Sequence, residues 1–286
     1  MSEKKSFLKR LFNFKTAYNY LRESASIIQQ GRFFKDKFFL CLYFLRIPFI
    51  FITSLFTKKT FRELEEKRKY LWSTITIKNK KGVFYCGNNI LTIHTIDENH
   101  EKKLYPYIET RSGVFIDVGA HAGKYSIWLA NDPTNKVIAI EPEKINFSML
   151  KKNISLNHLT NLIIINKGAY SARGKIPFYI SDKGDGTHSI NKVDAAMKET
   201  LIQVDTLDNI VEEMKLHSPV SKIKIDAEGA ELEVLKGATT ILRRDHPVLI
   251  IEIWDQNKDN FKAVNDLLKS YDYTALQIDE DNYLFS

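Results

Sequence analysis

The sequence predicts an α/β fold in which helices cover both faces of a mostly parallel sheet. Short apolar runs alternate with amphipathic stretches through the C-terminal part of the chain, which is the pattern of strand–helix–strand units. The run Val114–Val118 ends in Gly119, and Gly123 opens the helix that follows. A second run, Lys136–Ile140, ends in Glu141. With 286 residues, the chain is long enough for one large α/β domain and an extension.

The N-terminal region is predicted to be helical and basic. Ser6–Gln30 mixes basic and aromatic residues at helical spacing, and the apolar run Phe38–Phe56 follows it. Residues 1–81 hold 19 Lys and Arg against 6 Asp and Glu, a local charge of +13, whereas the remainder of the chain carries −6. This asymmetry points to a polyanionic partner for the N-terminal region, either a membrane surface or a nucleic acid.

The run Phe38–Phe56 has the length of a membrane span, but two of its residues oppose insertion. Its 13 Phe, Leu and Ile residues favour insertion by roughly 4 to 8 kcal/mol, and Arg46 opposes it by about 3 kcal/mol. Pro48 interrupts the helical hydrogen bonds. Two short helices lying in an anionic membrane interface therefore fit better than a span. Packing on the α/β domain or on a second subunit is the other alternative.

Before the first strand of the α/β domain, Leu71–Thr95 alternates apolar and polar residues and predicts a small antiparallel β unit. Glu101–Glu109 predicts a short helix. The expected regions are a helical extension (residues 1–70), the β unit with its linking helix (71–112) and the α/β domain (113–286). The two cysteines have no pairing or metal-ligand spacing, which fits a reducing compartment. We expect a cytoplasmic protein, with residues 1–59 as the region for peripheral contact with the inner face of the membrane.

The α/β domain is predicted to continue to the C-terminus. The expected helices are Lys124–Ala130, Lys144–Leu156, Leu207–Met214, Ala230–Arg243 and Asn260–Ser270. The further expected strands are Leu162–Asn166, Lys175–Ile180, Lys222–Ile225, Val248–Ile253 and a closing hairpin of Tyr273–Gln277 with Asn282–Phe285.

The loop from Gly119 to Gly123 has the features of a site for a nucleoside-type cofactor. Its glycines permit a sharp turn and close packing of the next helix. The dinucleotide fingerprint needs a glycine where this chain has His121, and Asp117 repels a phosphate but suits a cation. Glu141, 22 residues after Gly119, is placed to accept hydrogen bonds from ribose hydroxyls. These features favour S-adenosylmethionine, which carries an ammonium and a sulfonium and no phosphate, over a dinucleotide.

Four stretches, spread over about half of the chain, resemble the FkbM-type methyltransferases. They are FIDVGAHAGKYS (Phe115–Ser126), IEP (Ile140–Pro142), VDTLD (Val204–Asp208) and IKIDAEGAELEVLKGA (Ile223–Ala238). The last is the most specific, because its dense acidic core stands at a strand-to-helix junction. The resemblance implies a Rossmann-like sheet of seven strands, one of them antiparallel, and methyl transfer from S-adenosylmethionine to an oxygen, often on a sugar or a secondary metabolite.

The resemblance also implies which residues bind the cofactor. They are Asp117, Gly119, His121, Gly123, Tyr125, Ser126 and Glu141.

Methyl transfer also requires residues that orient the acceptor and take its proton. Asp226 and Glu228 follow one predicted parallel strand and Glu252 ends the next, so their side chains are expected at the same edge of the sheet. Each has a structural alternative, because Asp226 can cap the following helix and Glu228 suits its N-terminus. His188, in the Gly-containing loop Ser181–Asn191, is a fourth candidate catalytic residue. No His or Cys spacing supports zinc, and no metal is expected.

The sequence thus predicts an S-adenosylmethionine-dependent O-methyltransferase for a hydroxyl on a glycan, a lipid-linked sugar or a secondary metabolite. A nucleic-acid methyltransferase is the alternative that the basic N-terminus favours, but the Asn/Asp-Pro-Pro-aromatic motif is missing: the nearest match is DPTN, starting at Asp132. An NAD-dependent oxidoreductase is disfavoured by His121 and Asp117. A non-catalytic, membrane-associated module that keeps the fold is the remaining alternative.

Overall fold

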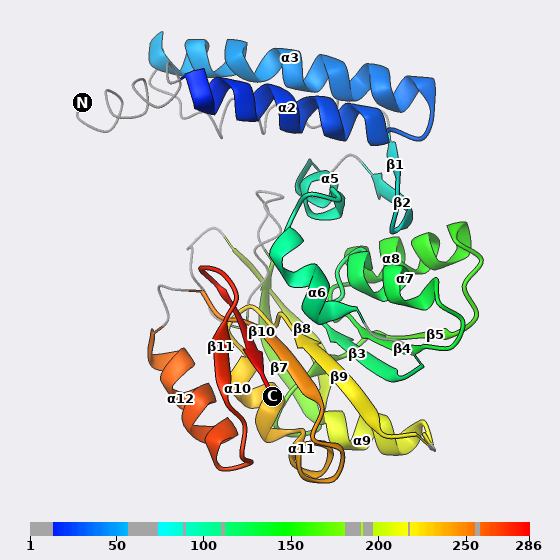
Figure 1. Cartoon of the computed structure of the whole chain (residues 1–286), viewed down its shortest axis with the longest axis vertical. Helices are drawn as coiled ribbons and strands as arrows, with labels where there is room; N and C mark the ends of the chain where they lie inside the picture. The colour runs from blue at the N-terminus through cyan, green and yellow to red at the C-terminus, as the bar shows by residue number, and fades with distance from the viewer. Residues whose placement is uncertain are drawn as a thin grey trace. The chain divides into compact units, whose positions relative to one another are not determined.

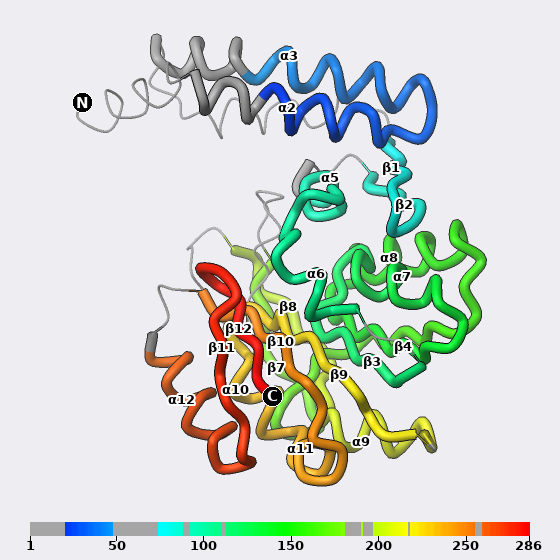
Figure 2. Tube along the Cα trace, in the orientation of Figure 1, coloured from blue at the N-terminus to red at the C-terminus, as the bar shows by residue number. Residues whose placement is uncertain are grey.

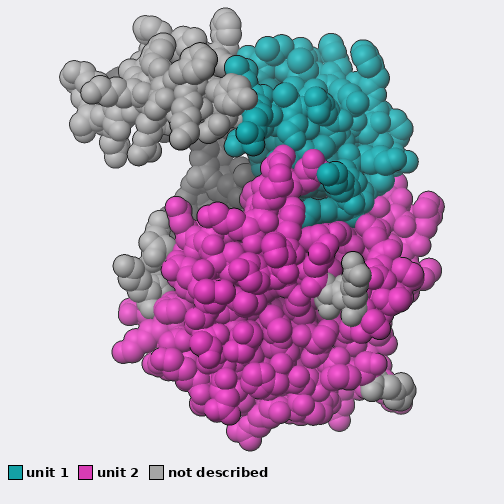
Figure 3. All heavy atoms as spheres, viewed as in Figure 1, with its two compact units in different colours: residues 1–97 teal, residues 98–286 magenta. Residues whose placement is uncertain are grey.

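The computed structural model describes residues 14–56, 74–87, 90–109, 112–180, 190, 197–216, 218–254 and 258–286. The chain divides into two compact units, residues 1–97 and 98–286, which Figure 3 shows in different colours. The predicted division into three regions, with boundaries at residues 70 and 112, stays a prediction.

Among its described residues, the first unit contains a pair of helices, a β-hairpin and a further helix (Figure 1). These elements are α2 (Phe14–Gln30), α3 (Phe34–Phe56), β1 (Ile75–Asn79), β2 (Gly82–Gly87) and α5 (Ile90–Ile96).

The turn between α2 and α3 is fastened to β1. The N–H of Arg32 donates a hydrogen bond to the carbonyl oxygen of Thr76 at 2.8 Å. α3 begins where the buried carboxylate of Asp36 accepts a hydrogen bond from the N–H of Phe33 at 3.0 Å, which satisfies one of the open donors at a helix start. The helix predicted before residue 30 is confirmed over Phe14–Gln30.

The prediction of two short helices in the run Phe38–Phe56 is wrong, because α3 continues as one helix through Pro48. A proline removes one backbone hydrogen bond, but α3 is also held by packing against α2 and β1, with Leu40 and Phe44 buried. Within the described ranges, no helix combines the length and the apolar character that crossing a bilayer requires.

The β unit predicted for Leu71–Thr95 is confirmed for β1 and β2, which pair antiparallel. The residues after them form α5 instead of a strand, because Ile93 and Ile96, one helical turn apart, are both buried. The side-chain amide of Asn79 holds the end of this helix by donating to the carbonyl oxygen of Ile96 at 3.0 Å. Short apolar runs fit the helical and the strand period equally well, so the sequence pattern alone did not separate them.

The second unit contains the α/β domain. Its helices are η2 (Lys102–Leu104), α6 (Tyr105–Ile108), α7 (Lys124–Ala130), α8 (Lys144–Leu156), α9 (Leu207–Glu213), α10 (Glu231–Lys236), α11 (Thr239–Asp245) and α12 (Lys258–Lys269). Its strands are β3 (Val114–Val118), β4 (Lys136–Ile140), β5 (Leu162–Ile165), β6 (Gly168–Ala169), β7 (Gly174–Ile180), β8 (Lys198–Asp205), β9 (Val220–Ile225), β10 (Val248–Glu252), β11 (Ala275–Gln277) and β12 (Asn282–Phe285).

The main sheet has seven strands in the order β11-β12-β10-β9-β3-β4-β5. β12 runs antiparallel to both of its neighbours, and every other pair is parallel. The predicted Rossmann-like sheet with one antiparallel strand is therefore confirmed. From β3 the chain moves outward through β4 and β5, whereas β9 and β10 extend the sheet in the other direction (Figure 2). The order reverses between β3 and β9, which is where sheets of this kind bind their ligands.

All five residues of β3 are buried because helices cover both faces of the sheet. Val114, Ile116 and Val118 join the core that contains the buried residues of α9, α11 and α12. Asp117, between two of these residues, points to the opposite face and contacts α7 through Ser126. The alternation along β3 therefore directs one carboxylate to the face that carries α7.

A three-stranded sheet, in the order β6-β8-β7, contains the predicted strand Lys175–Ile180. Its partner β8 was not predicted, because five of its eight residues are polar and only its second half alternates buried and exposed positions. The VDTLD stretch joins β8 to α9, and its acids hold neighbouring segments together. Asp205 is fully buried and accepts hydrogen bonds from Lys167 and Arg173 at 2.9 Å and 3.0 Å.

The single helix predicted over Ala230–Arg243 is wrong, because the structure breaks it into α10 and α11 at Gly237. The carbonyl oxygen of Gly237 accepts a hydrogen bond from the N–H of Asp208 instead of continuing the helix. The carboxylate of Asp208 then caps α11 by accepting from the N–H groups of Thr240 and Ile241 at 2.8 Å and 3.0 Å. A contact with α9 therefore decides where the helix ends.

Candidate functional site

The loops that follow β3 and β9 touch where the strand order reverses. Gly119 adopts a φ of +78°, and a Cβ at this position would lie 1.9 Å from the carbonyl oxygen of Asp226. The N–H of Asp226 donates to the carbonyl oxygen of Val118 at 3.0 Å. Glycine permits this approach because it has no side chain. The predicted cofactor loop and the predicted acceptor-side residue Asp226 therefore lie against each other.

The rest of the glycine loop is held by β4 and α8. His121 has a φ of +51°, and its backbone N–H donates to Oε2 of Glu141 at 2.8 Å. Asn153 of α8 donates to the carbonyl oxygen of Ala122 at 2.9 Å. Gly123 has a φ of +90°, and a Cβ there would come within 2.5 Å of a leucine side chain of α8. His121 therefore contributes to the loop through its backbone, next to the predicted ribose-binding acid.

Asp117 and Lys224 stand next to each other on the neighbouring strands β3 and β9. Their side chains are buried, at 2% and 3% exposure, and Asp117 accepts a hydrogen bond from the hydroxyl of Ser126 at 2.5 Å. Burial raises the pKa of Asp117, and the ammonium of Lys224 opposes this rise. The negative charge of Asp117 is thus partly balanced within the protein, and the contact with Ser126 brings two predicted cofactor-site residues together.

Glu141 is buried at the end of β4, with a backbone N–H on each of its oxygens. One oxygen accepts from His121 at 2.8 Å and the other from Glu143 at 2.9 Å. Burial raises the pKa of Glu141 to about 7 in spite of these hydrogen bonds. Because each carboxylate oxygen has two lone pairs, Glu141 retains acceptor capacity for hydroxyl groups.

The structure brings the predicted acids Asp226, Glu228 and Glu252 into electrostatic contact. The charge of Asp226, together with burial, raises the pKa of Glu252 well above its usual range. Burial and the charge of Asp226 raise the pKa of Glu228 to about 9. The ammonium of Lys224 donates to Oδ2 of Asp226 at 3.2 Å. His188, the fourth predicted catalytic residue, lies outside the described residues.

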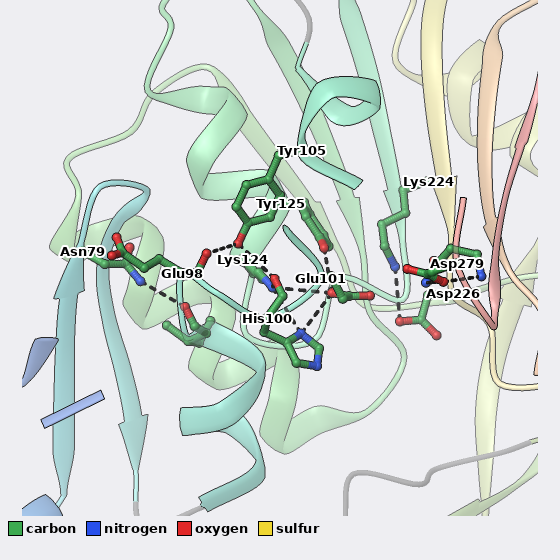
Figure 4. A network of polar contacts seen from close by, with 12 residues as sticks. Asn79, Glu98, His100, Glu101, Tyr105, Lys124, Tyr125, Lys224, Asp226 and Asp279 are labelled. Carbon is green, nitrogen blue, oxygen red and sulfur yellow. Dashed lines mark hydrogen bonds and ion pairs between the residues drawn. The ribbon is translucent and has the colours of Figure 1, made fainter. Parts of the chain in front are cut away.

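The site also contains Glu101, which the sequence analysis did not single out (Figure 4). Its backbone is left-handed, with a φ of +54°. Its Oε2 accepts a hydrogen bond from the hydroxyl of Tyr125 at 2.6 Å and lies 3.4 Å from the ammonium of Lys124 and 3.2 Å from Nδ1 of His100. Glu101 therefore joins the segment before β3 to the start of α7, and it gives the predicted cofactor residue Tyr125 a fixed partner.

Glu101 and Lys224 carry opposite charges at this edge of the sheet. Burial raises the pKa of Glu101, but His100, Lys224 and Lys124 lower it further, so the carboxyl is held ionised. Burial lowers the pKa of Lys224, but the surrounding carboxylates, Asp226 first, raise it above its usual range. The signal for Lys224 was present in the sequence, because a lysine between isoleucines in a buried strand needs charged partners. Glu101 lies outside the family-like stretches and gave no such signal.

Acidic groups outnumber basic ones in this site. The carboxylates are those of Glu101, Asp117, Glu141, Asp226, Glu228 and Glu252, and the buried ammonium groups are those of Lys124 and Lys224. Such an excess of acidic groups at the carboxyl ends of parallel strands suits a cationic ligand, because a nearby positive charge favours their ionised forms. Across the described residues, no group of three or more His, Cys, Asp or Glu is placed to hold a metal ion.

Several methyltransferases are similar to this chain. A region of 170 residues is 31% identical to a hexuronic acid methyltransferase, AglP, from Haloferax volcanii, covering 59% of this chain and 68% of that protein. A region of 178 residues is 25% identical to "Methyltransferase 1" of Beauveria bassiana, covering 54% of this chain and 70% of that protein. The solved structure of a methyltransferase FkbM from Methylobacillus flagellatus KT aligns with 93% of this chain and 58% of its own, at 17% identity and a TM-score of 0.44.

The family comparison covers the strands and loops that build the site. The model of the methyltransferase FkbM domain matches residues 117–275, which is more than half of the chain. The match begins at Asp117 and includes the glycine loop, Glu141 and the acids that follow β9 and β10. The chain therefore belongs to the FkbM family of methyltransferases, enzymes that transfer methyl groups.

Proposed function

We propose that this protein is an S-adenosylmethionine-dependent O-methyltransferase that acts on a hydroxyl of a glycan, a lipid-linked sugar or a secondary metabolite. Membership in the FkbM family supports methyl transfer. The similarity to a hexuronic acid methyltransferase supports a sugar as the acceptor. The observation that carries the proposal is the excess of carboxyl groups over ammonium groups beside a glycine loop at the reversal of the sheet.

The donor groups at this edge fit S-adenosylmethionine. Burial raises the pKa values of Glu141 and Glu228, and the charge of Asp226 raises that of Glu252. A bound cation would favour the ionised forms of all three acids. The glycine loop and Asp117 would hold the charged end of the cofactor, and Glu141 would bind its ribose. When bound, S-adenosylmethionine supplies a methyl group activated by its positively charged sulfur.

The acids on the acceptor side would orient the hydroxyl and take its proton. Asp226 is the best placed, because its side chain is 29% exposed while its partner Lys224 is only 3% exposed. Lys224 holds one oxygen of Asp226 and leaves the carboxylate open toward solvent. Burial and the charge of Asp226 raise the pKa values of Glu228 and Glu252, and a bound cation would favour the ionised forms, which can accept a proton. We assign to Asp226 the role of orienting the acceptor hydroxyl. We assign to Glu228 and Glu252 the role of accepting its proton.

Calorimetry tests the cofactor part of the proposal. Asp117→Ala and Glu141→Ala should each weaken binding of S-adenosylmethionine by about ten-fold or more, because each removes a buried acceptor. Glu212→Ala is the matched control, since Glu212 is an exposed acid on α9. Unchanged affinity in both site variants would refute this placement of the cofactor.

A transfer assay tests the acceptor. Cell extract is separated into lipid, glycan, protein and nucleic-acid pools, and each pool is incubated with the enzyme and methyl-labelled cofactor. We expect label in the glycan or lipid pool and a loss of about 100-fold or more in the Asp226→Asn variant, because the acceptor hydroxyl is no longer oriented toward the methyl group. Label confined to the nucleic-acid pool would contradict the proposed acceptor. Cofactor binding without label in any pool would contradict catalysis.

A further inference from the structure

α3 exposes large apolar side chains on the side opposite its buried one. We call them the α3 stripe: Phe34, Phe38, Leu42 and Leu45. Phe34 is 86% exposed and Leu45 is 67% exposed. At the helical rotation of about 100° per residue, the four positions fall within an arc of about 80°. Leu40 and Phe44, on the other side of the helix, are buried where α3 packs against α2 and β1.

Cationic residues flank the α3 stripe on both sides. By the same helical rotation, Lys35 and Arg46 lie along one border of the stripe and Lys37 lies along the other. Arg32, just before the helix, is exposed and places its guanidinium 5.0 Å from the centre of the Phe33 ring. The surrounding chain is also basic, because residues 1–81 carry a local charge of +13. The stripe is therefore an apolar surface inside a positively charged border.

We propose that the α3 stripe docks on the surface of an anionic lipid bilayer, with the helix lying along the interface. A bilayer places a layer of phosphates directly above an apolar layer, and this arrangement matches apolar side chains bordered by lysine and arginine. The aliphatic stem of Lys37 allows its charge to reach the headgroups while Phe34 and Phe38 enter the acyl boundary. The ammonium of Lys35 donates to the carbonyl oxygen of Thr74 at 3.1 Å, so its charge adds to the border from that position.

Two other classes of partner fit this surface less well. A nucleic acid offers phosphates to the cationic border, but its backbone contacts do not bury aliphatic side chains such as those of Leu42 and Leu45. A second copy of α3 would bring two cationic borders face to face. Asp36, the single acid in the sequence of α3, lies 3.7 Å from the ammonium of Lys35 and offsets part of that repulsion, but it is one acid against the three cations of the border.

This docking goes beyond the proposed chemistry and bears on where the chemistry takes place. A protein held at a bilayer surface meets acceptors that are themselves membrane-bound, and lipid-linked sugars are one of the proposed acceptor classes. A free glycan or a soluble metabolite would not require such a surface.

Flotation of the full-length protein tests the apolar part of the proposal. Vesicles of phosphatidylcholine alone are compared with vesicles that also contain phosphatidylglycerol, and the wild type should float with the anionic vesicles. Replacing Phe34, Phe38 and Leu45 together by serine should weaken binding by about 100-fold or more. The matched control replaces three exposed apolar residues of the other unit by serine and should bind as the wild type does. These residues are Ile145, Leu201 and Leu276.

The charge of the border is tested separately. Lys35→Glu combined with Lys37→Glu should weaken binding to the anionic vesicles by about five-fold or more for each cation removed, and added salt should act in the same direction. Lys102→Glu combined with Lys103→Glu removes two exposed lysines from the other unit and serves as the control.

A probe on the stripe reports insertion directly. When anionic vesicles are added, the tryptophan emission of Phe34→Trp should shift to the blue, and brominated lipid should quench it. The wild-type spectrum is subtracted to remove the signal of the native tryptophans. Circular dichroism and binding of S-adenosylmethionine should be the same in every variant, which separates lost docking from lost folding. The proposal is overturned if the wild type does not float, if the serine variant floats equally well, or if the stripe instead supports a concentration-dependent dimer in sedimentation.

Discussion

At the residue scale, Glu141 links cofactor affinity to pH. Burial raises the pKa of its carboxyl to about 7, above the ordinary value of 4.5, so the free protein holds this group partly protonated near neutral pH. A cationic ligand with ribose hydroxyls favours the ionised form. Binding of S-adenosylmethionine should therefore tighten by up to about ten-fold between about pH 6 and about pH 8.

The ratio of two affinities isolates this effect. Glu141→Gln removes the titrating group, and the titration of the ligand itself cancels when wild type and variant are compared at each pH by calorimetry. The wild-type advantage should grow with pH through the neutral range. A ratio that stays constant across this range would show that Glu141 does not titrate in the site. Glu212→Gln, on the exposed face of α9, should follow the wild type throughout.

The pKa of Glu101 is shifted in the opposite direction to that of Glu141, and this shift affects the stability of the fold. Its pKa is lowered in the folded protein by His100, Lys224 and Lys124, against the effect of burial. A depressed carboxyl contributes stability above its unfolded pKa, near 4.5, and this contribution is lost as the pH falls below that value. Glu101→Gln removes the counter-charge that lies 3.4 Å from the buried ammonium of Lys124, which costs about 3 kcal/mol at neutral pH.

Urea denaturation at several pH values measures this contribution. The difference in unfolding free energy between wild type and Glu101→Gln should be largest at neutral pH and should shrink toward about pH 3. The variant Glu212→Gln should show a small difference that hardly depends on pH. A difference for Glu101→Gln that grows on acidification would contradict the depressed pKa.

The sequence could predict the site acids but not their internal partners. Asp226 follows one parallel strand and Glu252 ends the next, and a single topological rule places the ends of such strands at one edge. The pairing of Asp117 with Lys224 depends on the register between β3 and β9, which strand patterns leave open. Glu101 reaches the site from a loop before β3 in a left-handed conformation that its local sequence does not signal.

At the element scale, Gly237 separates α10 from α11 because of a contact outside the helix. A Cβ at this position would lie 2.1 Å from the carbonyl oxygen of Tyr170, whereas a Cβ at Gly174 would meet no atom within 4 Å. Gly237→Ala should therefore lower the unfolding free energy by about 1 to 3 kcal/mol, because a backbone group must move. Gly174→Ala should change it by less than about 0.5 kcal/mol.

Denaturant midpoints of the two alanine variants check this prediction. Helix propensity alone predicts that Gly237→Ala raises the unfolding free energy, since alanine stabilises a helix interior relative to glycine. A stabilised Gly237→Ala variant would mean that α10 and α11 can merge without cost. The continuous helix predicted from Ala230 to Arg243 failed for this reason: its apolar periodicity is real, but a packing contact from a distant segment ends it.

The N-terminal elements show the same limit of local patterns. Ile93 and Ile96 satisfy a helical period, and the shorter alternation around them also fits a strand, so packing decided in favour of α5. Pro48 suggested a break in the apolar run, yet α3 continues through it. The strands of the main sheet were predictable because their apolar runs are short, bounded by turn residues and separated by helices.

At the scale of the whole molecule, the two units divide the proposed tasks. The α3 stripe lies in residues 1–97, and the described site residues from His100 to Glu252 all lie in residues 98–286. The match to the FkbM family, residues 117–275, falls entirely within the second unit. The net charge divides in a similar way: residues 1–81 carry +13, and the rest of the chain carries −6.

A fragment of residues 98–286 should therefore bind S-adenosylmethionine with an affinity within about three-fold of the full chain, while it no longer floats with anionic vesicles. Calorimetry and flotation on the same preparations measure the two properties, and circular dichroism shows whether the fragment is folded. The Glu141→Ala variant of the fragment should lose binding, which ties the signal to the site. A folded fragment that does not bind the cofactor would show that the first unit contributes to the cofactor site. A fragment that still floats would place the membrane-binding surface in the methyltransferase domain instead of on α3.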